Sequence, residues 1–405
     1  MPLTTELDTR TMPRERAAWP AVYSLALGAF VLVTAELLPI GLLTPMANDL
    51  EVSNGAIGQT ITAVGIAAAL AGPLLILAAG RVNRRLILWT LMGALVVSSI
   101  LTGLSTDMVI LLSARALLGF AIGGFWAMLT MLAIRLVPSQ LVPRAMAIIL
   151  MGISAGITVA PSIGAFLGSL LGWRETFFLS AALGLVTLVI QFFTLPSLPA
   201  TSTSAIEKFA KVIARPSVLL GIATVLIGMS GHIAAFTFIR PFLEISPVLQ
   251  VSTISLALLV FGIGGLIGNM VSSKIAEHSP AIAIASSSAL VALSILVLAI
   301  AGTHPTLALI ATAIWGCAYG GFPVATTIWN ARAAAEADLA EPAGALHSTA
   351  FQVAIACGGI LGGLLIDGVG LTGLFIYSSI TMAIGAVIMF SLGRSFERRE
   401  VAASE

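Results

Sequence analysis

The sequence predicts an all-α membrane protein whose twelve transmembrane helices form two pseudo-symmetric six-helix bundles. Hydrophobic residues make up 58% of the 405 residues and charged residues only 9%, whereas soluble domains carry about a quarter charged residues. Apolar runs of about 18 residues or more, the length that a helix needs to cross a bilayer, recur from end to end. These runs do not alternate between apolar and polar residues, so a transmembrane β-barrel is excluded.

Charged residues, prolines and polar clusters divide the chain into the twelve expected spans. They cover residues 19–44, 55–79, 86–104, 107–136, 143–170, 175–195, 217–243, 251–273, 280–301, 305–330, 343–366 and 370–392. The first apolar stretch is too long for the core of a signal peptide, so we expect an uncleaved first span. Cys317 and Cys357 fall inside spans as small apolar residues, and no zinc spacing or disulfide framework is visible.

The distribution of lysine and arginine predicts the orientation, because short cytoplasmic loops carry the excess of positive charge. Sixteen of the nineteen basic residues fall on the side of the N-terminus. These sixteen are Arg10, Arg14, Arg16, Arg81, Arg84, Arg85, Arg135, Arg144, Lys208, Lys211, Arg215, Lys274, Arg332, Arg394, Arg398 and Arg399. Arg174 and Arg240 fall at the opposite edge, and Arg115 lies within the fourth span. Both termini are therefore expected in the cytoplasm.

The longest polar break, residues 196–216, splits the spans six and six. It combines three prolines, a Ser/Thr cluster and three basic residues, which favours a linker between two repeated bundles over an ordinary loop. The expected parts of the chain are a tail (1–18), a first bundle (19–195), the linker (196–216), a second bundle (217–393) and a second tail (394–405).

Glu36 is the one carboxylate that we place deep inside a span. A charged side chain near the centre of a membrane helix costs about 2.5 to 3.5 kcal/mol on insertion, so it is by default a functional residue that faces the bundle interior or a watery cavity. The alternative is a structural carboxylate paired permanently with a cation.

Arg115 is the candidate partner of Glu36. Counting along the first and fourth spans at 1.5 Å per residue places both residues roughly 7 to 9 Å from the midplane on the outer side. We expect them to face one cavity, in contact directly or through water. A carboxyl group placed between apolar surroundings and a cation can act as a protonation switch.

The fifth span carries a small residue at nearly every fourth position, with a proline among them. These positions are Gly152, Gly156, Pro161, Gly164 and Gly168. Small residues at this spacing let helices approach closely, and proline introduces a kink. The face therefore indicates tight packing, which would form part of a gate if it lay between the two bundles.

The remaining polar and aromatic residues at membrane depth are candidates for a substrate site. They are Thr34, Gln59, Thr62, Trp126, His232, Trp315, Tyr319 and Gln352. Aromatic faces and amides suit a flat, uncharged ligand that forms hydrogen bonds. His232 is the strongest candidate in the second half, because it lies near the middle of its span and can titrate.

Motifs for nucleotide binding and hydrolysis are absent from the sequence. It has no phosphate-binding loop, dinucleotide fingerprint, HExxH or GxSxG in a supporting context. We therefore expect no metal and no cofactor, and no enzyme activity. Transport would be driven by an ion gradient, with the proton as the coupling ion, since a charge that crosses the membrane gains about 2.3 kcal/mol per 100 mV.

These patterns together resemble the major facilitator superfamily. The run RALLGFAIGG around Arg115 is similar to the motif in the fourth span whose arginine takes part in proton coupling, and the fifth span resembles the antiporter signature. The loop AAGRVNRR partly matches the motif between the second and third spans, through Arg81, Arg84 and Arg85. Gly80 stands there in place of an aspartate and Asn83 in place of a glycine.

Within that superfamily, TAELLPIGLL in the first span resembles the bacterial sugar and drug efflux branch. Short segments such as GGFWAM, GWR, IRP and IWG are similar to the purine ribonucleoside efflux pumps. The resemblance implies that Glu36 carries the proton, that Arg115 is its partner and that the glycine and proline face of the fifth span is a gate.

The function expected from this resemblance is export of purine ribonucleosides, such as inosine and guanosine, in exchange for protons. The protein would work as a monomer in the lipid of the bacterial inner membrane, by alternating access and without a nucleic-acid partner. The alternatives are export of sugars or of drugs such as chloramphenicol, proton-driven uptake, and a membrane-embedded enzyme or sensor.

Overall fold

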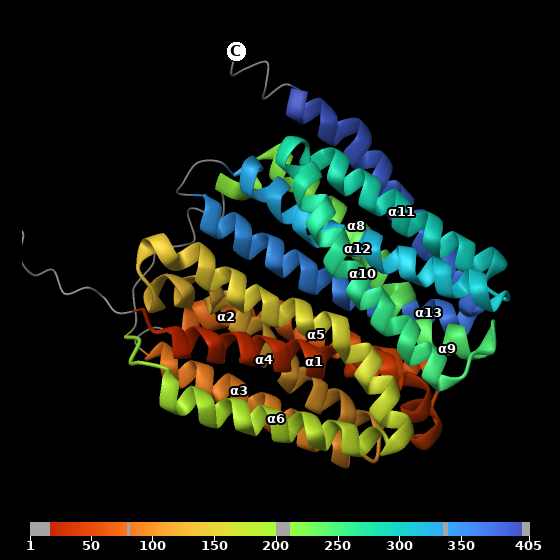
Figure 1. Ribbon diagram of the computed structural model, residues 1–405, viewed down its shortest axis with the longest axis horizontal. Coiled ribbons are helices and arrows are strands. Elements are labelled where there is room, and N and C mark those ends of the chain that lie inside the picture. The colour runs from red at the N-terminus through yellow and green to blue at the C-terminus, as the bar shows by residue number, and fades with distance from the viewer. Residues whose placement is uncertain (1–16, 79–81, 200–210, 335–338, 399–405) are drawn as a thin grey trace, which may run out of the picture.

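The computed structural model describes residues 17–78, 82–199, 211–334 and 339–398, and within these ranges the chain forms helices and no strands (Figure 1). The helices of the first half are α1 (Trp19–Asp49), α2 (Asn54–Ala78), α3 (Arg84–Leu104), α4 (Met108–Leu136), α5 (Val142–Leu170) and α6 (Trp173–Thr194). Those of the second half are α8 (Pro216–Thr237), α9 (Ile239–Ile245), α10 (Val251–His278), α11 (Pro280–Ala301), α12 (Pro305–Ala333) and α13 (Ala340–Ile388). Short 3₁₀ and π segments precede α5 and follow α13, at Ser139–Leu141 and Met389–Gly393.

The helix α13 contains two membrane crossings. Its 49 residues would extend about 74 Å at 1.5 Å per residue, more than twice the thickness of the hydrocarbon core. The chain turns at Gly370, where φ is 74° and ψ is 179°, a conformation that is essentially restricted to glycine. The eleven long apolar helices found in the described part of the chain therefore provide the twelve crossings that the sequence predicts.

Several expected spans differ in detail from the structure; α10, for example, continues to His278 instead of ending at residue 273. The first span continues past residue 44 to Asp49, because Pro45 is accommodated inside α1 rather than ending it. The seventh span, expected as one helix over 217–243, is broken at Phe238 into α8 and the short α9. Residues 1–16 of the first tail, 200–210 of the linker and 399–405 of the second tail lie outside the described residues.

The helices pack as two groups, which Figure 1 shows as a lower layer from red to yellow-green and an upper layer from green to blue. In the first group α1 packs on α5, α2 on α4 and α3 on α6. In the second, α8 packs on α13 and α10 on α12. Contacts between the groups run from α2 to α13, from α5 to α10 and from α1 to α9.

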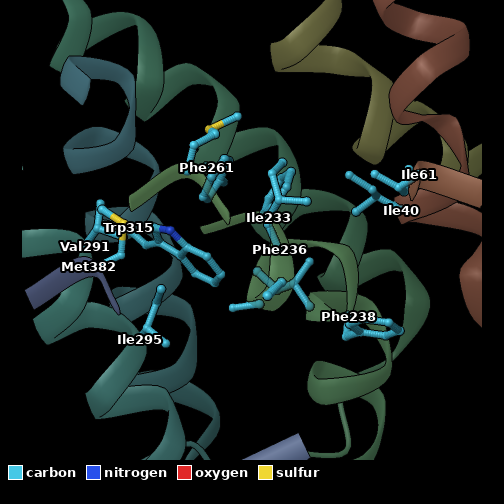
Figure 2. Packing of buried hydrophobic residues seen from close by; sticks show 14 of the residues in the cluster. Ile40, Ile61, Ile233, Phe236, Phe238, Phe261, Val291, Ile295, Trp315 and Met382 are labelled. Atoms are coloured by element: carbon cyan, nitrogen blue, oxygen red, sulfur yellow. The ribbon is translucent and has the colours of Figure 1, made fainter. Parts of the chain in front are cut away.

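We call the face where α1 begins the inner face, and the face where it ends the outer face; the basic residues predict that the inner face is cytoplasmic. Among the residues that the structure describes, the buried core is continuous between the bundles only toward the outer face. There Ile40 and Ile61 of the first bundle lie opposite Ile233, Phe236 and Phe238 of the second (Figure 2). The inner half of the first bundle has a separate apolar cluster of its own.

Hydrogen bonds join the bundles in the same outer half. Ser162 on α5 donates to the carbonyl oxygen of Ser255 on α10 at 2.7 Å, and Ser53 donates to Asp367 at 3.0 Å. Because the shared core and these bonds lie beyond the midplane, the structure is closed at its outer face.

Candidate functional site

Glu36 lies on α1 with only 7% of its surface exposed. Its Oε1 atom is buried and has no hydrogen-bond partner among the described residues. A buried polar atom without a partner costs about 1 to 3 kcal/mol, and more when it is charged. Burying this unpaired carboxyl group therefore lowers the stability of the folded protein.

Arg115 on α4 reaches the same turn of α1, but it binds backbone rather than the carboxylate. Its Nη1 donates to the carbonyl oxygen of Ala35 and its Nη2 to that of Glu36, each at 2.7 Å. Pro39 explains the first bond, because proline has no N–H and leaves the carbonyl four residues earlier, that of Ala35, without its helical partner. The guanidinium satisfies this carbonyl and holds the turn that carries Glu36.

This arrangement differs from the permanent ion pair that was the alternative expectation for Glu36. Arg115 is 1% exposed and interacts electrostatically with Glu36, yet no hydrogen bond joins the guanidinium to the carboxylate. The charge of Arg115 is near enough to influence the proton affinity of Glu36, while the carboxyl oxygens stay available to a proton or a ligand.

A second proline of α1, Pro45, also frees a carbonyl oxygen that an arginine binds, but this arginine belongs to the other bundle. Pro45 leaves the carbonyl of Gly41 free, and Arg240 on α9 donates to that oxygen. Arg240 also pairs with Glu244 at 2.8 Å, and Glu244 accepts a 2.5 Å hydrogen bond from Thr44. We call Arg240, Glu244, Thr44 and Gly41 the outer latch, because they join α1 to α9 near the outer face.

The second bundle contains an aromatic group around His232. Trp315 on α12 donates from Nε1 to Nδ1 of His232 at 3.1 Å. The ring of Tyr319 stacks on His232 with centroids 3.5 Å apart, and Phe236 and Phe261 flank the same ring. Tyr319 packs against the core cluster that also contains Leu38 and Ile40 of α1, so the aromatic group and the turn of α1 that follows Glu36 belong to one packed region.

Three further candidates are buried polar groups without a partner in the described chain. They are Thr34 on α1, Thr62 on α2 and Gln352 on α13. Gln59 reaches the carbonyl oxygen of Gly359 at 3.5 Å, where α2 packs on α13. Trp126 is different, because it packs against the separate inner cluster of the first bundle, away from His232 and Trp315.

The small residues of α5 pack within the first bundle rather than between the bundles. A Cβ atom at Gly152 would lie 2.9 Å from the carbonyl carbon of Ala26, and one at Gly164 would lie 2.9 Å from the carbonyl oxygen of Leu38. Gly156 and Gly168 also face α1, and the carbonyl oxygen of Pro161 lies against Gly41. A gating role would therefore act through α1, whereas Thr158 and Ser162 are the residues of α5 that meet α10.

Substituting Gly152 by alanine is expected to destabilise the folded protein by about 1 to 3 kcal/mol, because the methyl group meets backbone that cannot rotate away. The midpoint of thermal unfolding in detergent measures the effect. Gly93→Ala is the matched control, since a Cβ there meets no atom within 4 Å. Equal midpoints for the two variants would contradict this packing.

The first turn of α3 is bound to the end of α6 through Arg85. Arg85 donates to the carbonyl oxygen of Phe192 at 2.8 Å and lies over the ring of Trp89. Arg84 is largely buried, and Arg81 lies outside the described residues. Asn83 accepts from the backbone N–H groups of Arg85 and Leu198, so the residue at the place of the expected glycine caps α3.

The sequence pointed to Glu36, Arg115 and the aromatic residues but missed the outer latch. Arg240 was placed only at the edge of a span, and Glu244 was not singled out. The available signal was the pair of prolines in α1, Pro39 and Pro45. Each of them leaves the carbonyl oxygen four residues earlier without its helical N–H, and that oxygen needs another donor.

Comparisons with known proteins agree with this architecture. The family described as Major Facilitator Superfamily matches residues 25–341. The chain is 35% identical over 374 residues to the purine ribonucleoside efflux pump NepI of Escherichia coli O6:H1, which covers 92% of this chain and 94% of that protein. The protein of the same name from Salmonella enteritidis PT4 is 34% identical over the same length.

Solved structures show the same fold at low sequence identity. The chain resembles a bacterial homologue of the human lysosomal transporter Spinster in an inward-facing, unoccupied conformation. The TM-score is 0.76 at 16% identity, with 96% of this chain and 98% of that chain covered. It also resembles a point mutant of the nucleoside transporter NupG, with a TM-score of 0.72 at 17% identity and coverage of 93% and 99%.

Proposed function

This chain belongs to the major facilitator superfamily as a multi-pass inner-membrane transporter, and we propose that it exports purine ribonucleosides in exchange for protons. The observation that carries the proposal is the unpaired carboxyl group of Glu36 on α1, which is followed by Leu38 and Ile40 in the same core cluster as Trp315 and Tyr319 of the aromatic group. The similarity to the NepI pumps over 92% of the chain supports the choice of substrate.

The site offers the two kinds of contact that a ribonucleoside needs. Aromatic rings stack on the flat base, and the buried hydroxyl and amide groups of Thr34, Thr62 and Gln352 lack partners in the described chain. They would bond with the hydroxyls of the ribose or the edge of the base. A neutral substrate leaves the charge of Glu36 for the proton.

In the proposed cycle, one bundle rocks against the other around this site. The structure, closed at its outer face, corresponds to the state that receives substrate from the inner face. Opening of the outer half would separate the shared core and the outer latch, release the substrate and admit a proton to Glu36.

Counterflow in proteoliposomes tests the substrate class. We expect inosine and guanosine inside the vesicles to drive uptake of labelled inosine, whereas arabinose and chloramphenicol do not. A pH indicator in the lumen tests the direction of coupling, because substrate added outside an antiporter makes the lumen alkaline and substrate added outside a symporter makes it acidic. Counterflow with arabinose or chloramphenicol alone would overturn the proposed substrate.

A further inference from the structure

A hydrogen bond from Trp315 fixes the orientation of the His232 ring. The indole N–H of Trp315 only donates hydrogen bonds, so Nδ1 of His232, 3.1 Å away, must be the acceptor. The proton of the neutral ring is therefore on Nε2. A doubly protonated ring would turn an N–H toward the indole N–H and lose this bond.

The neighbouring rings keep His232 in this orientation. Tyr319 stacks on it at 3.5 Å with an angle of 7° between the rings, and Phe236 stacks at 5.3 Å. His232 is 1% exposed and Trp315 is fully buried. Turning the ring over would replace the bond to Trp315 by a carbon atom facing the indole N–H.

No hydrogen bond among the described residues involves Nε2 of His232, and this nitrogen is not one of the fully buried side-chain atoms that lack a partner. The next residue, Ile233, and Phe236 one turn later lie toward Ile40 and Ile61 of the first bundle (Figure 2). This part of α8 thus borders the interface at which the proposed substrate would bind. The Nε2–H group is therefore a donor that the protein leaves unpaired without enclosing it completely, so a ligand can supply its acceptor.

We propose that Trp315 holds His232 in the tautomer that donates from Nε2. His232 then determines the preference among purine ribonucleosides by donating a hydrogen bond to the edge of the base. The proposal rests on the function proposed above. The edge of a 6-oxopurine presents two adjacent acceptors, O6 and N7, whereas a 6-aminopurine presents the acceptor N7 beside an amino donor. A fixed donor directed at position 6 of the base therefore favours inosine and guanosine, which have the acceptor O6 there, over adenosine, by about tenfold or more.

The test is the ratio of the concentrations of adenosine and inosine that half-inhibit inosine counterflow. We expect this ratio to be about ten or more in the wild type. Trp315→Phe keeps an aromatic ring beside Phe261 but removes the indole N–H, so His232 can adopt either tautomer and accept from the amino group of adenosine. The ratio is then expected to fall toward one.

A second variant and a matched control separate recognition from folding. His232→Phe keeps a ring for Tyr319 to stack on and removes the donor, so its ratio should also approach one. Trp329→Phe removes another buried indole N–H from the same helix, one that donates to the carbonyl oxygen of Ser217 at 2.9 Å, and should keep the wild-type ratio.

Each outcome decides between the proposals. Nucleoside counterflow with an unchanged ratio in both Trp315→Phe and His232→Phe would overturn the role of His232 and leave the proposed function intact. If Trp315→Phe does not fold, the ratio of His232→Phe decides alone. Absence of nucleoside counterflow in the wild type would overturn the proposed function, and the role of His232 with it.

Discussion

Glu36→Gln is expected to abolish proton-driven accumulation of substrate while preserving exchange of substrate for substrate. Glutamine has the shape of the protonated acid but cannot ionise, and Oε1 of Glu36 has no bond to lose in the described chain. A neutral nucleoside exchanged for one proton moves one charge per cycle, so 100 mV sustains a gradient of about 50-fold in the wild type. The variant should sustain none. Radiolabelled inosine in proteoliposomes with an imposed potential and pH gradient measures the difference.

Glu244 provides the matched control, because it is a carboxylate that accepts a hydrogen bond across the contact between the bundles. Its partners are Arg240 and Thr44 in the outer latch, and Glu244→Gln keeps an oxygen that can accept from Thr44. We expect this variant to keep the gradient. An undiminished gradient in Glu36→Gln, or its loss in Glu244→Gln alone, would show that the proton is carried elsewhere than on Glu36.

The parts of the fold that follow from local chemistry could be predicted from the sequence. Apolar runs of the length of a bilayer define the twelve crossings, and the turn at Gly370 falls where the sequence separates the last two spans. The ends of the helices were less predictable. Pro45 would end a helix in water, but here a guanidinium from α9 satisfies the carbonyl that it frees, and α1 continues to Asp49.

The site shows the same division between local and long-range information. Depth along two helices brought Glu36 and Arg115 to one level, because rise per residue is a local property. It could not reveal that Arg115 binds the carbonyl oxygens of α1, which depends on how α4 is rotated against α1. The rotation of each helix also decides that Trp126 packs on the inner cluster and that the small residues of α5 face α1. The spacing of residues along one helix defines a face, but it does not identify the neighbouring helix that this face contacts.

Gly262→Ala is expected to move the protein toward the state that is open at the outer face. A Cβ at Gly262 on α10 would lie 2.5 Å from the Cα atom of Thr158 on α5, and backbone cannot move aside unless the helices separate. These helices belong to different bundles and meet in the outer half, so their separation is the opening movement itself. Overpacking of about 1 to 3 kcal/mol corresponds to a change of about 5- to 150-fold in the ratio of the two states.

Spin labels at the outer ends of the same two helices measure this ratio, with Ser169→Cys on α5 and Ser252→Cys on α10 in a background where Cys317 and Cys357 are replaced by serine. Pulsed electron paramagnetic resonance should show a longer distance in Gly262→Ala than in the parent. Gly265→Ala, three residues along α10, is the matched control, because its Cβ would lie at an ordinary 3.6 Å from the carbonyl oxygen of Gly316 within the second bundle. The same short distance in all three proteins would mean that α5 and α10 do not separate when the outer face opens. In that case the movement would have to pass through the contacts of α2 with α13 instead.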